Sequence, residues 1–137
     1  GLAAFIKTVE FYKKNNVIEH IWDYGKKLMK GMTQIAKDLE IQDYFKMMGI
    51  SCSPNYLTYD KSGNNSLAFR TLFSQEMIRN GVLIPWISLS YSHGEKELKI
   101  TLEATRKSLE IYKKALNEGV EKYLEGDTIK PVFRKYN

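Results

Sequence analysis

The sequence predicts an α+β domain, with a small antiparallel or mixed sheet and long helices packed on one of its faces. Four segments carry apolar residues at helical spacing, and short apolar stretches bounded by turn residues lie between them. Neighbouring strands that are joined closely favour antiparallel pairing. The 137 residues suffice for one hydrophobic core. We therefore expect a single domain over residues 1–125 and a tail over residues 126–137.

The first predicted helix, residues 2–15, is apolar around most of its circumference, so it should be buried on more than one side. No Ser, Thr, Asp or Asn stands before it to cap its first turn. These features indicate a helix that lacks its beginning and its second packing partner, and an ordinary terminal helix is the alternative. Asn15 and Asn16 break this helix and can cap the next.

The second predicted helix, residues 17–39, has the clearest periodicity of the chain. Its Met and Trp stripe indicates core packing rather than a cofactor site. Gly25 and Gly31 each weaken the helix by about 1 kcal/mol relative to Ala. They can in return allow another segment to pack closely.

Two strands are predicted next, over residues 44–52 and 55–59, with Pro54 ending the first. Their short connection favours an antiparallel pair. Residues 60–65, DKSGNN, have the composition of a tight polar loop.

A third helix is predicted from the N-cap residue Ser66 to Asn80, and Gly81 suits the left-handed position that ends it. Short strands are predicted over residues 82–84 and 86–90, with a bend at the intervening proline.

The last long helix is predicted from Glu95 to at least Asn117, capped by Ser92 or Gly94. Its acidic first turn suits the positive end of the helix dipole. The tail that follows residue 125 should need another surface to lie on.

Composition excludes several classes of function. The 21 basic and 16 acidic residues give a net charge of +5, and the early lysines are interleaved with acids. This pattern favours a solvated helix face over a nucleic-acid surface. No apolar run is long enough to span a membrane, and no segment has the pattern of a signal peptide. The single cysteine excludes an internal disulfide, and we expect a cytoplasmic protein. From the charge pattern and the lack of a long apolar run, we expect neither a nucleic-acid nor a membrane partner.

The main candidate site is the polar sequence Ser90-Tyr91-Ser92-His93, between a predicted strand and a helix start. Such a turn has free backbone N–H groups and could line a pocket. Capping of the helix by Ser92 and His93 is the alternative. His20 should be a packing or surface residue. Neither histidine has a second ligand at metal-binding spacing, and phosphate-binding or nucleophile motifs are absent, so we expect no metal and no catalytic residue.

Four collinear segments carry a resemblance to a known family. Residues 1–10 resemble the helix that follows the catalytic-lysine region in class III pyridoxal-phosphate-dependent aminotransferases. Residues 17–31 resemble the next helix, and residues 79–85 a turn containing Gly-Val. Residues 90–98 are similar to the end of glutamate-1-semialdehyde aminomutase-like members.

This resemblance implies the C-terminal small domain of a fold-type I transferase, which closes the substrate cleft. The lysine that forms the Schiff base would lie upstream, so the isolated chain would be inactive. Pyridoxal phosphate would be bound by a large domain that is missing here. Residues expected to line the cleft are Ser88, Ser90, Tyr91, Ser92 and His93. Residues 86–90 lack the arginine with which many members grip a substrate carboxylate, which favours the aminomutase-like branch.

Partners follow from the same resemblance. The chain should pack on its own large domain, and the parent enzyme should be a homodimer. Without the large domain, residues 2–12 would expose apolar surface and the chain should self-associate. Two alternatives stay open: a stand-alone α+β interaction module without catalysis, and a nucleic-acid-binding protein, for which the sequence has no motif.

Overall fold

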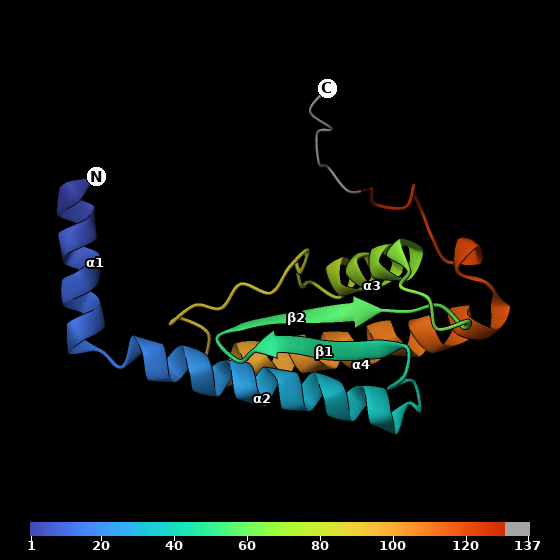
Figure 1. The fold of residues 1–137 in the computed structure, drawn as a ribbon, viewed down its shortest axis with the longest axis horizontal. Coiled ribbons are helices and arrows are strands. Elements are labelled where there is room, and N and C mark those ends of the chain that lie inside the picture. Colours follow the sequence, from blue (N-terminus) through green and yellow to red (C-terminus); the bar gives the residue numbers. More distant parts are fainter. Residues whose placement is uncertain (131–137) are drawn as a thin grey trace.

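The computed structural model describes residues 1–130 and confirms the α+β class. A two-stranded antiparallel sheet and four helices make up this part of the chain (Figure 1). The elements in chain order are α1 (Leu2–Lys14), α2 (Val17–Asp38), β1 (Phe45–Ile50), β2 (Ser53–Thr58), α3 (Leu67–Arg79), α4 (Glu95–Glu118) and a short 3-10 turn, η1 (Val120–Lys122).

The hairpin has one buried and one exposed face. Phe45 lies opposite Thr58 in the β1–β2 register, and both are buried. On the same face Tyr56 is buried and Met47 is partly buried. Met48 and Ile50 lie on the other face and are exposed. Helices α2, α3 and α4 pack against the buried side, with the hairpin lying over α4 between the other two (Figure 1). The prediction of helices on one face is confirmed.

Aromatic rings fill the centre of the core. The ring of Phe73 lies 4.8 Å from that of Phe45 and 5.0 Å from that of Tyr56, centre to centre. Tyr112 of α4 is fully buried, and its hydroxyl lies within hydrogen-bonding distance of the Tyr44 and Tyr59 carbonyls and accepts from the Tyr59 N–H. This hydroxyl therefore joins α4 to the open end of the hairpin, where β1 begins and β2 ends. Burial raises its pKa, so it remains protonated.

The capping residues at the helix ends agree only in part with those predicted from the sequence. Ser66 caps α3 as predicted, accepting from the Phe69 N–H, and Gly81 takes a left-handed φ of 81° after it. Gly94, rather than Ser92, is the N-cap of α4. Asn16 precedes α2 but its side chain makes no capping bond. The break between α1 and α2 lies where it was predicted, with Asn15 ending the first helix.

The strands predicted over 82–84 and 86–90 are wrong, because residues 82–90 form no strand. The reason lies in β2, whose outer edge has few groups left to pair with. The Tyr56 N–H donates to the Asn55 side chain, and the Tyr56 carbonyl accepts from Arg70. The Thr58 carbonyl accepts from the Ser66 N–H. A third strand would find these groups already bonded.

Pro54 was predicted to end the first strand, and it lies inside β2 instead. It shares a face with Tyr56, opposite Gly49 of β1. At this alternate position the strand directs its backbone groups to the outer edge, where the missing N–H of proline costs no ladder bond.

Glycines on α2 allow close packing, as predicted. A Cβ atom on Gly25 would lie 1.7 Å from the Ser51 carbonyl oxygen, so the hairpin turn packs directly on the helix backbone there. On Gly31 it would lie 2.6 Å from the Leu102 side chain of α4.

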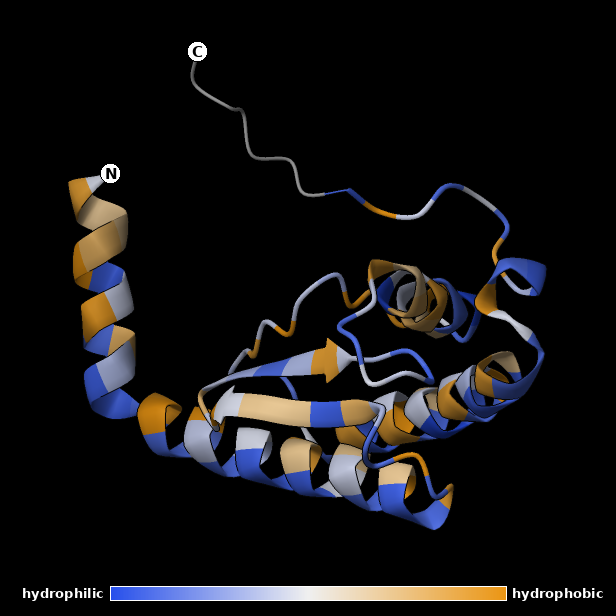
Figure 2. Cartoon of the chain, turned by 45° about the vertical axis from the view of Figure 1, so that its right-hand side comes forward, coloured by the Kyte–Doolittle hydropathy of each residue, from blue (hydrophilic) through white to orange (hydrophobic). Residues whose placement is uncertain are grey.

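Helix α1 is the exception to this packing. It projects away from the rest of the structure at a steep angle to α2, and much of its surface is hydrophobic (Figures 1 and 2). None of its 13 residues is buried.

The segment after η1 lies on α3. The Glu125 N–H donates to the Gln75 side chain, and the Ile129 N–H donates to the Thr71 hydroxyl. Arg79 forms an ion pair with Glu125. The first part of the predicted tail thus lies on the surface of α3, whereas residues 131–137 lie outside the described residues. Across the described part of the chain, no helix combines the length and apolarity needed to cross a membrane.

Candidate functional site

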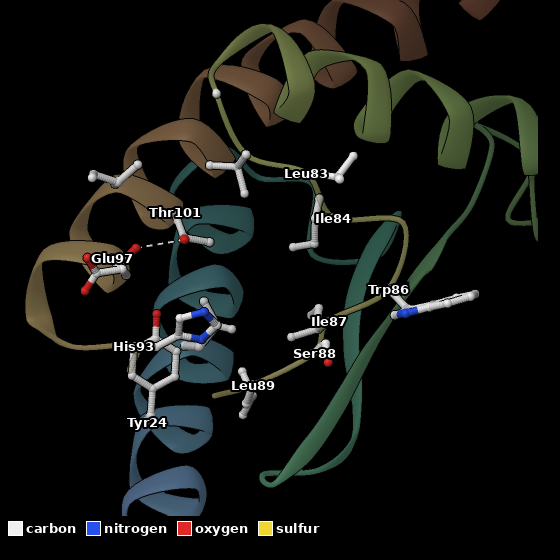
Figure 3. A pocket seen from close by; sticks show the side chains of 14 residues that line it. Tyr24, Leu83, Ile84, Trp86, Ile87, Ser88, Leu89, His93, Glu97 and Thr101 are labelled. Carbon is white, nitrogen blue, oxygen red and sulfur yellow. Dashed lines mark hydrogen bonds between the residues drawn. The ribbon is translucent and has the colours of Figure 1, made fainter. Parts of the chain in front are cut away.

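A cavity of about 270 Å3 lies between α2, α4 and the segment that joins α3 to α4 (Figure 3). Its wall is mainly apolar and includes a few polar side chains. The lining residues are Tyr24 and Leu28 of α2, residues 81–84 and 86–89 of the connecting segment, His93, and Glu97, Ile100 and Thr101 of α4. A mainly apolar cavity with a few polar groups is the usual form of a small-molecule site.

The connecting segment is held in place by side chains of the core. After the turn at Gly81, the Val82 N–H donates to the Met77 carbonyl of α3. The Tyr56 hydroxyl donates to the Ile84 carbonyl at 3.2 Å, and Arg70 donates to the Pro85 carbonyl at 3.3 Å. These bonds fix an irregular segment that has no strand partner.

The two faces of this segment differ. The side chains of Ile84 and Ile87 point toward α2 and α4, whereas those of Leu83 and Trp86 point away from the cavity (Figure 3). Leu83 is 78% and Trp86 73% exposed. Large apolar residues this exposed at the rim of a cavity indicate a surface that another molecule or domain can cover.

The Ser90–His93 turn is a closed hydrogen-bonded unit. The His93 N–H donates to the Ser90 carbonyl at 3.1 Å, and the Ser90 N–H donates to Nδ1 of His93 at 3.2 Å. The Ser92 N–H donates to the Ser90 hydroxyl at 3.2 Å. Because Nδ1 accepts, the neutral ring of His93 carries its proton on Nε2.

His20 attaches this turn to α2. Its Nε2 donates to the His93 carbonyl at 2.8 Å. Its ring also meets the ring of Tyr91 edge-on at 5.1 Å, and Tyr91 in turn meets Phe11 of α1 at 5.5 Å. The expectation of a packing role for His20 is confirmed by these contacts.

Tyr24 is the most buried polar residue of the cavity wall, with 7% of its surface exposed. Its ring lies beside that of His93, 5.6 Å between centres (Figure 3). Burial, followed by the charges of Glu97 and Glu95, raises the pKa of its hydroxyl. The group is therefore a neutral hydroxyl at physiological pH.

Glu97 closes the first turn of α4. Its carboxylate accepts from the Gly94 N–H at 2.9 Å, and this bond to the backbone is the main reason why its pKa lies below the ordinary range. The Thr101 hydroxyl donates to the Glu97 carbonyl one turn later. The carboxylate is thus already bonded to the backbone at the start of α4, so Glu97 acts mainly as a cap of this helix.

The structure divides the five predicted cleft residues. Ser88 and His93 line the cavity, whereas Ser90, Tyr91 and Ser92 do not. Ser90 and Ser92 close the turn, and Tyr91 packs on His20.

Sequence reasoning missed Tyr24 and Thr101 in the wall. Tyr24 lies four residues before Leu28 on the buried stripe of α2, and this spacing could have placed it on the inner face. Thr101 lies four residues after Glu97 and likewise shares a face with it. Neither pattern distinguishes a cavity from packed core.

The wall does not suit pyridoxal phosphate as an independently bound cofactor. It contains no lysine to form an imine and no arginine or lysine to neutralise a phosphate. Elsewhere in residues 1–130, no group of three His, Cys, Asp or Glu side chains is placed to hold a metal ion.

Comparison with known proteins yields a partial match. Glutamate-1-semialdehyde 2,1-aminomutase of Archaeoglobus fulgidus is 27% identical over 118 residues, which cover 80% of this chain and 28% of that protein. The chain therefore spans less than a third of the relative that it matches. No protein-family model and no solved structure matches the chain. These residues are accordingly similar to a region of that aminomutase.

Proposed function

We propose that this chain is the C-terminal small domain of a pyridoxal-phosphate-dependent aminomutase or aminotransferase of class III. The observation that carries the proposal is the similarity to an aminomutase along 80% of the chain. The α+β fold, with helices on one face of a small sheet, is compatible with such a domain.

The composition of the cavity wall favours a role in binding and orienting the substrate rather than in catalysis. Without a basic side chain, the wall can neither form the imine nor bind the phosphate of the cofactor. The cofactor, which serves as an electron sink in such enzymes, would be held by residues outside this chain.

The contribution of this chain would be to bind and to orient. Ser88 and His93 offer hydrogen bonds at the cavity, with His93 donating from Nε2 because its Nδ1 is already bonded. Leu83 and Trp86 would be covered by the large domain of the same protein, and their burial would exclude water from the cleft. The parent enzyme would be a homodimer.

The intact product of the natural gene tests this proposal. We expect a polypeptide roughly three times the length of this chain, as the coverage of the relative implies. It should absorb visible light when loaded with pyridoxal phosphate, and it should act on glutamate-1-semialdehyde or a related amino compound. This chain alone should show neither property. A mature product no longer than this chain, or turnover by this chain alone, would contradict the proposal.

A stand-alone interaction module is the second candidate, and the exposed apolar surface of α1 favours it. The two candidates differ in what Ser88 and His93 do. Within an intact enzyme, Ser88→Ala should change KM or kcat, while Ile78→Ala on the exposed surface of α3 should change neither. A product without any cofactor-dependent activity would leave the interaction module as the better description.

A further inference from the structure

Helix α1 carries the largest group of exposed apolar side chains on any one helix of the described chain. Leu2 is 75% and Phe5 64% exposed, and about half of each of the Ile6, Phe11 and Tyr12 side chains is in contact with solvent. The helix meets the rest of the structure mainly through the edge-on contact of Phe11 with Tyr91.

Helix α1 gains little stability from the rest of the described chain, because none of its residues is buried. Packing of an apolar face is the usual source of stability for such a helix, so α1 needs a covering surface.

The apolar residues of α1 form a seam with coiled-coil spacing. Leu2, Phe5, Val9 and Tyr12 are separated by three, four and three residues, and Ile6 lies beside them. Positions at this spacing share one face of a helix. A seam of this kind fits the matching seam of another helix.

We propose that the α1 seam binds the α1 seam of a second copy of this chain, with the two helices antiparallel. In this arrangement Leu2 lies against Tyr12 of the second copy, and Phe5 lies against Val9 of the second copy. A two-fold axis near the middle of the helix repeats both layers, as closed dimers require.

Side-chain size and charge select the antiparallel direction. Antiparallel layers pair a large residue with a smaller one, which fills space evenly. A parallel pair would instead place Phe5 against Phe5 and Tyr12 against Tyr12, and it would bring Lys13 and Lys14 of both copies together. That clustering of four like charges is unfavourable.

The area is adequate for a reversible dimer. Five seam side chains of about 100 Å2 each would bury on the order of 500 Å2 per copy, or 1,000 Å2 in total, which is at the lower end for specific interfaces. We therefore expect dissociation in the micromolar range. The proposal concerns this chain without the large domain of the proposed function, which would otherwise lie against residues 2–12.

Sedimentation of the whole chain tests the interface. The unmodified chain should be dimeric at tens of micromolar, and Phe5→Asp should raise the dissociation constant at least tenfold. Ile78→Asp is the matched control, because Ile78 is 56% exposed on α3, and it should leave the constant unchanged. A monomeric chain, or equal effects of the two substitutions, would overturn the proposal.

Disulfide trapping tests the direction. In a Cys52→Ser background, Leu2→Cys and Tyr12→Cys chains are oxidised separately and as a mixture. Antiparallel helices keep identical positions about 15 Å apart along the axis, too far for a disulfide. Cross-links should therefore form in the mixture alone, and efficient cross-linking of either chain with itself would overturn the antiparallel arrangement.

Discussion

Two regions of this chain differ in how their apolar side chains are covered. In the first, formed by α2, α3, α4 and the hairpin, aromatic rings are fully buried and the central tyrosine hydroxyl is bonded. In the second, formed by α1 and residues 82–89, large side chains such as Phe5 and Trp86 face solvent. The core of the first region is covered by this chain itself, whereas the second region has large apolar surfaces that further protein can cover.

This difference predicts that substitutions in the two regions affect different properties, namely stability of the fold and association with other molecules. Substitutions in the first region should act on the free energy of unfolding, because they remove packing that the chain provides for itself. Substitutions in the second should mainly affect contacts with other molecules. Each of the following predictions tests this division.

The largest effect is expected for Phe73→Ala. Phe73 is fully buried between Phe45 and Tyr56, and truncation of a core phenylalanine lowers the free energy of unfolding by about 3–5 kcal/mol. Phe5→Ala removes the same atoms from an exposed position, and below the dimer dissociation constant it should change stability by less than about 0.5 kcal/mol. Urea unfolding at low protein concentration measures both, and equal losses would mean that the two regions do not differ.

A smaller loss is expected where the hairpin turn meets α2. Gly25→Ala places a methyl group 1.7 Å from the Ser51 carbonyl oxygen and 3.0 Å from the Leu89 side chain, so the backbone must shift. Overpacking of this kind costs about 1–3 kcal/mol, which exceeds the gain in helix propensity from alanine.

Gly126→Ala is the control for this change, because a Cβ atom there meets nothing within 4 Å. Thermal unfolding should show a lower Tm for Gly25→Ala and a nearly unchanged Tm for Gly126→Ala. An unchanged Tm for both would show that the turn can move away from α2 at little cost, and that this part of the core is less tightly packed than its geometry indicates.

The same division decides what the sequence could predict. Helical periodicity, the Ser66 cap and the Gly81 stop depend on residues that are close in sequence, and the structure confirms them. The strands at 82–90 were wrong, since whether an extended segment becomes a strand depends on the free edge of β2, which Asn55 and Arg70 occupy.

The candidate site was predictable to a similar extent. The unusual polar sequence at residues 90–93 drew attention to His93, which lies in the cavity wall. Tyr24 is 69 residues away in sequence and reaches the same cavity only because α2 packs against α4. Contacts of this kind depend on tertiary packing, which no local pattern of the sequence contains.

The smallest effect is expected at the junction of the two regions, where Glu97 bonds to the Gly94 N–H. That bond lowers the pKa of Glu97 in the folded chain below its ordinary value of 4.5. A carboxyl group whose pKa falls on folding stabilises the fold above its unfolded pKa, and this stabilisation is lost as the pH falls through the folded pKa. Glu97→Gln should therefore lower Tm slightly at neutral pH.

In acid, the two proteins should converge, because a protonated Glu97 and a glutamine are both neutral at this position. Glu110→Gln, in the middle of α4, controls for loss of negative charge from the helix in general. Parallel Tm profiles of the unmodified and Glu97→Gln chains from neutral pH down to below pH 4 would show that the first turn of α4 does not depend on this charge. The start of α4, and with it the His93 turn, would then be held by the Ser90 and His20 hydrogen bonds instead.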